Sequence, residues 1–405
     1  MERYPSYKPS GVKWLGEIPS HWEMKRWRFL MSENTTKNTN CKERLQLQFR
    51  YGDIVRKANQ SEESDVLDTI SKYTVVEPDD IMINGLNLNY DFISQRVAQV
   101  QERGVITSAY ISLRPTEIAN SRYFTYFLKS MDAKKMFHGM GTGIRLTLSY
   151  NELKNHFIPC PSPEEQSAIA AYLDTATAKI DAAIAQQQKM IDLLNERKQI
   201  IINRAVTKGL NPNAKMKDSG VEWIGEMPEG WEVRKLKHIA KLQSGDTISS
   251  DSFTENGYPV FGGNGFRGYT NRYTNDGDFV LIGRQGALCG NVNYAHGQFF
   301  ASEHAVVVYP YHKENLIWLG EVIRTSNLNQ YSQSAAQPGL AVSMIQNISY
   351  PYPPEEEREE IALYIEKNIK VIDEGINNYH QQISLLQERK QIIINEVVTG
   401  KVRVV

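Results

Sequence analysis

Two glycine-rich motifs are the part of this chain that comes closest to a cofactor site. The segment FGGNG at 261–265 fits the F-x-G-x-G loop with which methyltransferases hold S-adenosylmethionine, and GNGFRG at 263–268 fits G-x-G-x-x-G. A dinucleotide loop needs a strand before it and a helix after it, because the helix N-terminus receives the phosphates. Residues 258–261 can form a strand, but 269–277 have the composition of a turn. We therefore expect no cofactor to be bound by this chain itself.

Other catalytic signatures are missing from the sequence. It contains no Asn/Asp-Pro-Pro-aromatic segment, the usual catalytic partner in an amino-methyltransferase, and no G-x-x-x-x-G-K-S/T phosphate loop. Pro78-Asp79 lacks the acidic-x-Lys partner of a nuclease, and the eight histidines show no metal-ligand spacing. His304 lies in an apolar run, so we interpret it as a core histidine. The sequence therefore predicts no catalytic residue and no metal site.

Without a cofactor, the second glycine motif is best explained as a polar and basic hairpin. It brings Asn264, Arg267, Tyr269 and Arg272 close together in the sequence. Glycine lets the backbone approach another surface closely, and arginine and asparagine can each make two hydrogen bonds to one base edge. These residues are therefore candidates for contact with DNA. An ordinary β-turn with solvated polar tips has the same composition and stays open as the alternative.

Two internal repeats show which elements must position such residues. LNERKQIIIN at 194–203 returns as LQERKQIIIN at 386–395, and the same offset of 192 residues aligns IAAYLD with IALYIE. SGVKWLGEIP at 10–19 returns as SGVEWIGEMP at 219–228, with an offset of 209. The chain is thus built twice, each time as a Trp motif, a variable block and a long helix. The second variable block is shorter by 17 residues, the difference between the two offsets.

Each long helix is predicted by its boundary signals and by its apolar spacing. SPEE at 162–165 forms a capping box, Gly209 and Pro212 supply stop signals, and the second copy should run from about Pro354 to Thr399. A helix of about 44 residues is roughly 66 Å long, and its single apolar stripe needs a partner. We expect an intramolecular antiparallel coiled coil through Ile169, Leu173, Ile180, Leu194, Ile201, Ile361, Ile365, Ile372, Leu386 and Ile393. Two unrelated helices, each packed on its own domain, are the alternative.

The Trp motifs and the composition add constraints on packing and compartment. Each motif is predicted to be an extended clasp that buries Trp14 and Trp22, or Trp223 and Trp231, against a domain or a helix end. Three cysteines without a C-x-x-C pair indicate a reducing cytoplasm, and no apolar run is long enough to cross a membrane. With a net charge of −1, a DNA-binding chain must concentrate its basic residues locally or borrow positive charge from partners.

The two variable blocks are distant relatives of each other. DIMIN at 80–84 resembles DFVLI at 278–282, each an acidic turn followed by an apolar strand, and GIRLT at 143–147 parallels GLAVS at 339–343. We therefore expect one scaffold in both blocks, with different loops that recognise different things.

The whole chain resembles the specificity subunit of a type I DNA restriction–modification enzyme. The resemblance rests on the two Trp motifs, on the helix openings PSPEEQSAIAAYLD and PPEEEREEIALYIE, and on the repeated LxERKQIIIN. The variable blocks match only in outline. The resemblance implies an α+β fold with a pseudo-twofold internal repeat. Two target-recognition domains of mixed α/β structure with substantial β-sheet would occupy 1–160 and 211–352, and the long helices would occupy 161–210 and 353–405.

By the same resemblance, each recognition domain reads one half of a bipartite site in double-stranded DNA, and the coiled coil sets the gap between the halves. Two modification subunits dock on the helices and carry S-adenosylmethionine and the adenine-methylating chemistry. The ten apolar residues named for the coiled coil are also the candidates for this docking. Restriction subunits add translocation and cleavage that use ATP and magnesium. This chain would then be a subunit without catalysis of its own.

Family members differ in the residues that contact bases, so candidates come from chemistry and position. In the second domain they are Asn264, Arg267, Tyr269, Arg272, Arg284, Gln285 and Gln337. In the first domain they are Asn84, Asn87, Ser108, Tyr110, Arg145 and Thr147. Two other functions stay open: a coiled-coil scaffold that does not read DNA, and a fused DNA methyltransferase that uses FGGNG.

Overall fold

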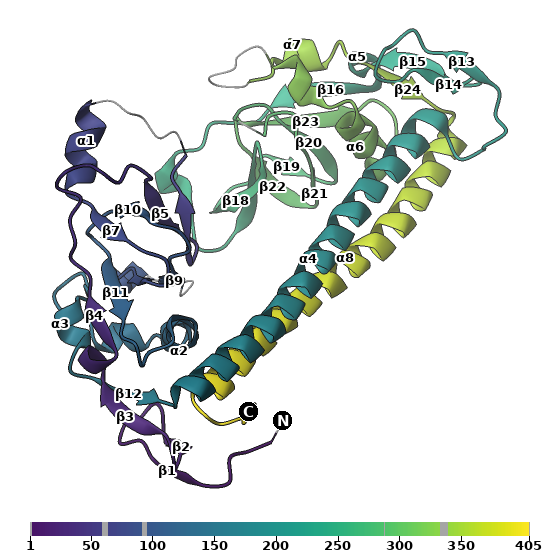
Figure 1. Cartoon of the computed structure of the whole chain (residues 1–405). Helices are drawn as coiled ribbons and strands as arrows, with labels where there is room; N and C mark the ends of the chain where they lie inside the picture. Colours follow the sequence, from purple (N-terminus) through teal and green to yellow (C-terminus); the bar gives the residue numbers. More distant parts are fainter. Residues whose placement is uncertain (1, 59–63, 91–94, 287, 333–338, 405) are drawn as a thin grey trace. The chain divides into compact units, whose positions relative to one another are not determined.

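The chain divides into two compact units in the computed structural model (Figure 1). One unit comprises Met1–Gln187 with Gln381–Val405, and the other comprises Gln188–His380. The two longest helices, α4 (Pro163–Lys208) and α8 (Glu355–Val398), contribute residues to both units. The structure describes residues 2–58, 64–90, 95–286, 288–332 and 339–404.

Helices α4 and α8 run antiparallel, as the sequence predicts. In the first unit, Lys390 Nζ lies 2.6 Å from Asp181 Oδ1. In the second unit, Lys198 Nζ lies 2.8 Å from Asp373 Oδ1. Asp181, the earlier of the two α4 residues, thus pairs with Lys390, the later of the two α8 residues, as an antiparallel arrangement requires. Because each partner on α8 is the repeat copy of a partner on α4, the two ion pairs are one interaction used twice.

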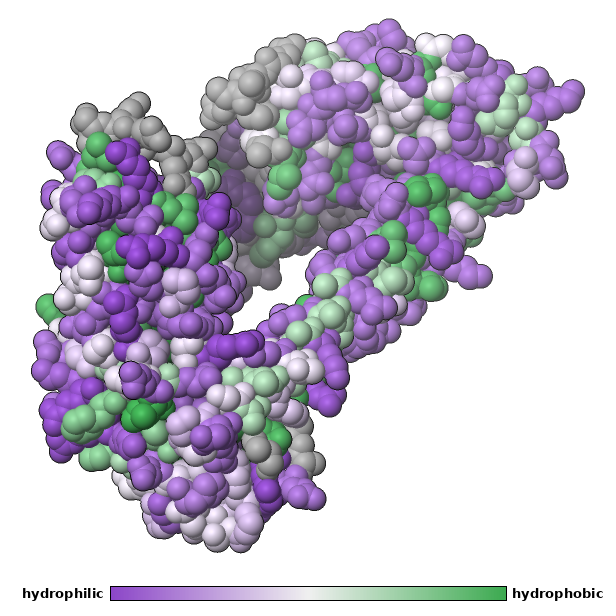
Figure 2. Space-filling model, viewed as in Figure 1, coloured by the Kyte–Doolittle hydropathy of each residue, from purple (hydrophilic) through white to green (hydrophobic). Residues whose placement is uncertain are grey.

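The predicted apolar stripe packs inside the chain. Both helix ends complete the core of a domain, since Ile169 and Leu173 belong to the buried cluster of the first unit and Ile361 and Ile365 to that of the second. Of the other predicted positions, Ile180 and Ile372 are buried, and Leu194, Ile201, Leu386 and Ile393 are half-buried. The buried positions are closed to a partner subunit, which corrects their assignment to docking. Other apolar residues stay exposed along the helix pair (Figure 2).

The first unit is built on a four-stranded antiparallel sheet. Its strand order is β4-β11-β8-β9, with β4 (Met31–Glu33), β11 (Ile111–Pro115), β8 (Ile81–Ile83) and β9 (Val97–Gln99). Helix α2 (Ser121–Ala133) packs on β9, and the Asn120 side chain caps it by accepting from two backbone N–H groups. Other elements of this unit are β5 (Leu47–Arg50) with β6 (Asp53–Arg56), β7 (Thr74–Val76) with β10 (Gly104–Ile106), β3 (Glu23–Arg26) with β12 (Phe157–Cys160), α1 (Ser64–Ser71) and α3 (Tyr150–Leu153).

The second unit repeats this scaffold. Its first sheet has the order β16-β23-β20-β21, again antiparallel, with β16 (Ala240–Ser244), β23 (Ala305–Pro310), β20 (Phe279–Gly283) and β21 (Val292–Ala295). Helix α6 (Leu316–Thr325) packs on β21 and is capped by Asn315, as α2 is by Asn120. The shared strand order confirms the expectation of one scaffold in both blocks. Other elements of this unit are α5 (Leu236–Ile239), α7 (Val342–Ile345) and β15 (Glu232–Lys235) with β24 (Ser349–Tyr352).

An additional sheet distinguishes the second unit. It has the order β18-β17-β22-β19, with β18 (Gly265–Thr270), β17 (Tyr258–Gly262), β22 (Gln298–Ala301) and β19 (Asn275–Asp276). Strands β17 and β18 form the predicted hairpin around Asn264, and β18 extends two residues into the segment that we interpreted as a turn. The two units therefore share a scaffold but differ in the elements added to it.

The Trp motifs form clasps on the helix ends. Strands β1 (Tyr7–Pro9) and β2 (Glu17–Pro19) pair in the first motif, and β13 (Met216–Asp218) and β14 (Glu226–Pro228) pair in the second. Trp22 and Trp231 are buried, as predicted, and each covers the glycine that ends a long helix, whereas Trp14 and Trp223 are only half-buried. Gly400 and Gly209 have φ angles of 71° and 70°, which only glycine adopts readily. Because the first clasp lies on the end of α8, the two chain termini meet in the first unit (Figure 1).

The helix start of α4 departs from the predicted capping box. Ser162 Oγ accepts the N–H of Glu165, as expected for an N-cap. The Glu165 carboxylate, however, accepts from Tyr4 Oη at 2.6 Å and lies 3.0 Å from His21 Nε2 instead of returning to Ser162. Its repeat copy, Glu357, accepts from Trp231 Nε1 at 2.7 Å. The third-position glutamates therefore tie the clasps to the long helices.

Candidate nucleic-acid interface

The β17–β18 hairpin presents most of the predicted second-domain residues to solvent. Asn264, Arg267, Tyr269 and Arg272 are all exposed. Phe266 and Tyr269 pack edge to face with 5.1 Å between ring centres. The guanidinium of Arg267 lies 5.7 Å from the centre of the Phe253 ring, and that of Arg272 lies 5.0 Å from the Phe300 ring. Each ring contacts a guanidinium group, whose in-plane N–H donors stay available for an anionic or base partner.

The glycines of FGGNG hold this hairpin against the first sheet of the second unit. A Cβ on Gly283, at the end of β20, would overlap the carbonyl oxygen of Gly263. Gly265 has a φ of 91°, and a Cβ there would lie 2.9 Å from Asn293 Oδ1. The motif is followed by strand β18, not by the helix that a phosphate-binding loop requires. Backbone packing therefore explains these glycines.

A polar edge lies beside the hairpin, where β16 and β20 end and β21 and β23 begin. Arg284 donates from Nη1 to Ser244 Oγ at 2.9 Å, and its backbone N–H donates to His304 O. Three side-chain nitrogens at this edge, Arg284 Nε, Asn293 Nδ2 and His304 Nδ1, are buried without a hydrogen-bond partner among the described residues. Buried polar atoms usually have partners, so three such nitrogens close together mark this edge as a candidate site for a polar ligand.

The residues of the polar edge show that one sequence prediction is wrong and where other predicted residues lie. His304 is a half-buried turn residue before β23, so our interpretation of it as a core histidine is wrong. Arg284 and Gln285 do lie at the edge, and Gln285 bridges to Gly339. Ser244 and Asn293 were missed by the sequence analysis. The only sign of them in the sequence is that each is a polar residue inside or at the end of an apolar strand pattern. Gln337 lies outside the described residues.

In the first unit, four of the six predicted residues lie on two loops that bond to each other. These are residues 84–90 and 142–148, which we call the loop pair. Backbone N–H groups of Leu88 and Leu148 donate to carbonyls of the opposite loop, at 3.1 and 2.9 Å. The Asn89 side chain adds a bond of 3.0 Å to the carbonyl of Ile144. The loop pair is therefore a single hydrogen-bonded surface.

The predicted residues of the loop pair differ in exposure. Asn87, Arg145 and Thr147 are exposed, whereas Asn84 is half-buried and its Oδ1 accepts the N–H of Leu86 at 3.2 Å. Asn87 has a φ of 50°, a left-handed conformation that asparagine tolerates better than most residues. Asn87, Arg145 and Thr147 can thus meet a ligand directly, while Asn84 shapes the loop.

The other two first-domain candidates lie in a different group of residues. Ser108 Oγ donates to Lys72 O at 2.7 Å and accepts from Lys37 Nζ at 2.6 Å. Tyr110 packs edge to face on Phe49, with 5.6 Å between ring centres. Both side chains are engaged within the unit. The sequence therefore grouped residues that the structure places in two sets, of which the loop pair is the more open.

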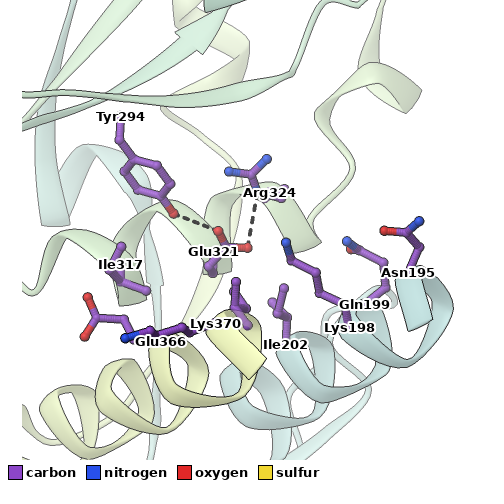
Figure 3. A pocket seen from close by; sticks show the side chains of 11 residues that line it. Asn195, Lys198, Gln199, Ile202, Tyr294, Ile317, Glu321, Arg324, Glu366 and Lys370 are labelled. Carbon is purple, nitrogen blue, oxygen red and sulfur yellow. Dashed lines mark hydrogen bonds and ion pairs between the residues drawn. The ribbon is translucent and has the colours of Figure 1, made fainter. Parts of the chain in front are cut away.

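A cavity of about 440 Å³ lies inside the second unit, between α6, Tyr294 of β21 and the long helices (Figure 3). Tyr294 Oη donates to Glu321 Oε1 at 2.8 Å, and Arg324 Nε donates to Glu321 Oε2 at 3.1 Å. Burial, together with the adjacent Glu321 carboxylate, raises the pKa of Tyr294, so its phenol remains a donor. Lys198, also in the lining, is paired with Asp373. This internal pairing is typical of a joint between domain and helix.

Two properties bear on the class of the protein. Among the described residues, no group of three or more His, Cys, Asp or Glu side chains is placed to hold a metal ion. None of the described helices is both long and apolar enough to span a membrane.

Comparison with known proteins identifies relatives of this chain. The sequence model of the family described as type I restriction modification DNA specificity domain matches residues 55–191 and 228–384. The EcoprrI type I restriction enzyme specificity subunit of Escherichia coli is 44% identical over 139 residues, which cover 33% of this chain and 35% of that protein. The MjaVIII specificity subunit of Methanocaldococcus jannaschii is 26% identical over 368 residues, 82% of this chain and 81% of that protein.

Solved structures show the same fold. A chain solved in work on complex assembly and conformational transition of the type I R-M system has a TM-score of 0.71 at 15% identity, covering 95% of this chain and 99% of that one. The HsdS subunit from Thermoanaerobacter tengcongensis has a TM-score of 0.50 at 16% identity, covering 95% of this chain and 98% of that one. Both halves of the repeat are matched by the family model. The chain therefore belongs to the family of type I restriction–modification DNA specificity domains.

Proposed function

We propose that this chain is the DNA specificity subunit of a type I restriction–modification complex. Each recognition domain reads one half of a bipartite site in double-stranded DNA, and the long-helix pair sets the gap between the halves. The observation that carries this proposal is a single sheet order, β4-β11-β8-β9 and β16-β23-β20-β21, that bears different polar loops in the two units. A shared scaffold with different loops is the expected design for two readers of different sequences.

The reading surfaces that we propose are the loop pair in the first unit and the hairpin with the polar edge in the second. Asn87, Arg145 and Thr147 are exposed in the first, and Asn264, Arg267 and Arg272 in the second. Arginine and asparagine match base edges in the major groove, and arginine also neutralises phosphates. Local groups of this kind allow a chain with a net charge of −1 to bind DNA.

The helix pair is the proposed docking surface for two modification subunits. Leu193 and Ile200 on α4 are 46% and 59% exposed, and their repeat copies Leu385 and Ile392 on α8 are 64% and 48% exposed. A spacing of seven residues places each pair on one face of its helix. Two copies of one exposed apolar pair, one in each unit, fit two copies of one partner. We call these pairs the two docking stripes.

Catalysis is assigned by this proposal to the partner subunits. The modification subunits would hold S-adenosylmethionine and methylate adenine, and the restriction subunits would use ATP and magnesium for translocation and cleavage. The chain itself would then neither methylate nor cut DNA. Tight binding of S-adenosylmethionine by the purified chain in calorimetry would instead favour a fused methyltransferase that uses FGGNG.

A domain exchange tests the proposed function. The block 25–158 begins in β3 and ends in β12, at Lys25 and Ile158, which face each other in these paired strands, so it can be replaced by that of a relative. Co-expression with the modification subunit and genome-wide detection of methylated adenine should show a changed first half-site, with the second half and the gap retained. A change in both halves contradicts two separate readers. Gel shifts at several salt concentrations, with the modification subunit present, test the alternative. If they detect no DNA binding, the chain is a coiled-coil scaffold that does not read DNA.

A further inference from the structure

A buried arginine lies directly beneath the loop pair of the first unit. Arg96 is 9% exposed, and its backbone immediately precedes strand β9. Its guanidinium donates to three carbonyl oxygens of one loop: Nη1 to Asn84 O at 2.9 Å, Nη1 to Leu86 O at 2.7 Å and Nη2 to Asn87 O at 3.2 Å. One side chain therefore fixes nearly the whole turn that carries the exposed Asn87.

The backbone of Arg96 is itself fixed on both sides. Its N–H donates to Asp132 Oδ2 at 2.8 Å, and Asp132 is a buried residue of α2. Its carbonyl accepts the N–H of Asn84 at 2.8 Å. The loop is thus connected through Arg96 to the core helix of the domain.

The chemistry of this contact needs arginine. A guanidinium offers five N–H donors in one rigid plane, so it can serve several carbonyls at once. A lysine ammonium in its place would be a single point on a flexible stem, unable to keep the same three partners in plane. The left-handed Asn87, whose carbonyl is one of the acceptors, would lose part of the support that maintains its conformation.

We propose that Arg96 is a positioning residue for recognition of the first half-site. It holds the loop pair in the shape that DNA meets, while the bases are contacted by exposed residues such as Asn87 and Arg145. The inference rests on the proposed function, because it needs the first domain to read DNA. The second unit shapes its surface by glycine packing between Gly263 and Gly283, so the effect of Arg96 is confined to the first half-site.

The test compares wild type with Arg96→Lys, each co-expressed with the modification subunit, by genome-wide detection of methylated adenine. We expect the preference of the variant for the correct first half-site over single mismatches to fall about tenfold, with the second half-site and the gap unchanged. A folded variant with an unchanged motif overturns the proposal, as does equal relaxation of both halves. If the wild type itself methylates no bipartite site, the proposed function fails, whatever the variant does.

A matched control separates positioning from stability. Arg358 is 6% exposed, pairs with Glu314 at 2.7 Å and donates to Pro353 O, at the start of α8 in the second unit. Arg358→Lys should lower the melting temperature and leave both halves of the motif unchanged. Relaxation of the first half-site by this variant would show that instability alone produces the effect and would overturn the proposal.

A second variant tests the loop pair if Arg96→Lys does not fold. A Cβ on Gly85 would overlap the carbonyl oxygen of Leu148, so Gly85→Ala forces the two loops apart without removing the buried charge. It should lower the preference for the correct first half-site over single mismatches, as Arg96→Lys does. An unchanged motif in the folded Gly85→Ala variant contradicts the proposal, because the loop pair could then shift without affecting recognition.

Discussion

The arginines discussed above have one of two roles, structural support or contact with a ligand, and the surroundings of each side chain distinguish them. Arg96 and Arg358 are buried, and their donors are used by carbonyls or carboxylates within the unit. Arg267 and Arg272 are exposed, and an aromatic ring lies against the guanidinium of each. Only the second kind has donors free for a base edge or a phosphate. Exposure and partners, which the sequence does not state, therefore assign the role of each arginine.

The first prediction concerns Arg267. If it contacts a base, Arg267→Ala should weaken binding to the specific site by about 1–3 kcal/mol and relax one position of the second half-site. Fluorescence anisotropy with specific and non-specific duplexes, in the presence of the modification subunit, measures both effects. Arg234→Ala is the matched control, because Arg234 also stacks on a ring (Tyr352, 4.1 Å) but lies on β15, away from the hairpin.

The salt dependence of Arg267→Ala separates its two possible roles. A contact to phosphate alone would weaken specific and non-specific duplexes alike and reduce the slope of log K against log salt by about one. Identical affinities for wild type and variant would show that the hairpin is an ordinary solvated turn and would remove Arg267 from the interface.

At the scale of elements, the hairpin and the sheet beneath it meet through glycine backbones. Because a Cβ at Gly283 would overlap Gly263 O, Gly283→Ala should separate the β17–β18 hairpin from β20. We expect a loss of about 1–3 kcal/mol in the free energy of unfolding, measured by urea denaturation, from overpacking. Gly230→Ala is the control, since no atom lies within 4 Å of its Cβ position and its stability should change little. Equal stability of the two variants would contradict the packing role of Gly283.

The docking stripes give a second prediction at this scale. Leu193→Lys with Ile200→Lys should remove one modification subunit and leave the other bound, since Leu385 and Ile392 are intact. The mass of the complex in native mass spectrometry or light scattering measures this directly. Lysines at Gln188 and Asn195, two exposed positions of the same helix that are also seven residues apart, control for added charge alone. Retention of both subunits in the stripe variant would place the docking surface elsewhere.

The sequence predicted elements best where a pattern repeats. The two long helices, the two clasps and the common scaffold follow from offsets that any reader of the sequence can count, because packing of a repeated amphipathic helix leaves a periodic trace. The site was predicted less completely. Arg284 and the hairpin residues were found from their chemistry, but Ser244 and Asn293 were missed. Ser108 was grouped with loops from which it is separate, because hydrogen bonds between distant segments leave no local pattern.

The same limit explains two wrong predictions. The Glu165 carboxylate was assigned to its own helix start, yet it binds Tyr4 and His21 from the distant N-terminal segment. The buried stripe positions were assigned to docking, yet the domain cores compete for the same apolar side chains. In both cases the side chain makes a tertiary contact with residues far away in the sequence, and a local sequence pattern does not show such a contact.

At the scale of the whole molecule, the repeat places one ion pair on each side of the middle of the helix pair. Asp181 pairs with Lys390, and Lys198 pairs with Asp373. The segment between the ion-paired residues on α4 has its repeat copy between those on α8. A change of helix length that preserves both pairs must therefore be equal in the two helices and lie between the ion-paired residues, as after Lys189 and after Gln381, which are equivalent in the repeat.

The last prediction uses this register to test whether the helices set the gap of the DNA site. Four residues inserted after Lys189 and four after Gln381 lengthen each helix by roughly 6 Å and nearly preserve its faces. Because duplex DNA advances about 3.4 Å per base pair, the gap in the methylated motif should grow by about one or two base pairs. Both half-sites should stay the same, since neither reading surface is altered. The same insertion in α4 alone, near Ile184, shifts one helix against the other, so one ion pair must break and stability should fall. An active, doubly extended chain that keeps the wild-type gap would show that the spacing of the half-sites is set outside the helix pair.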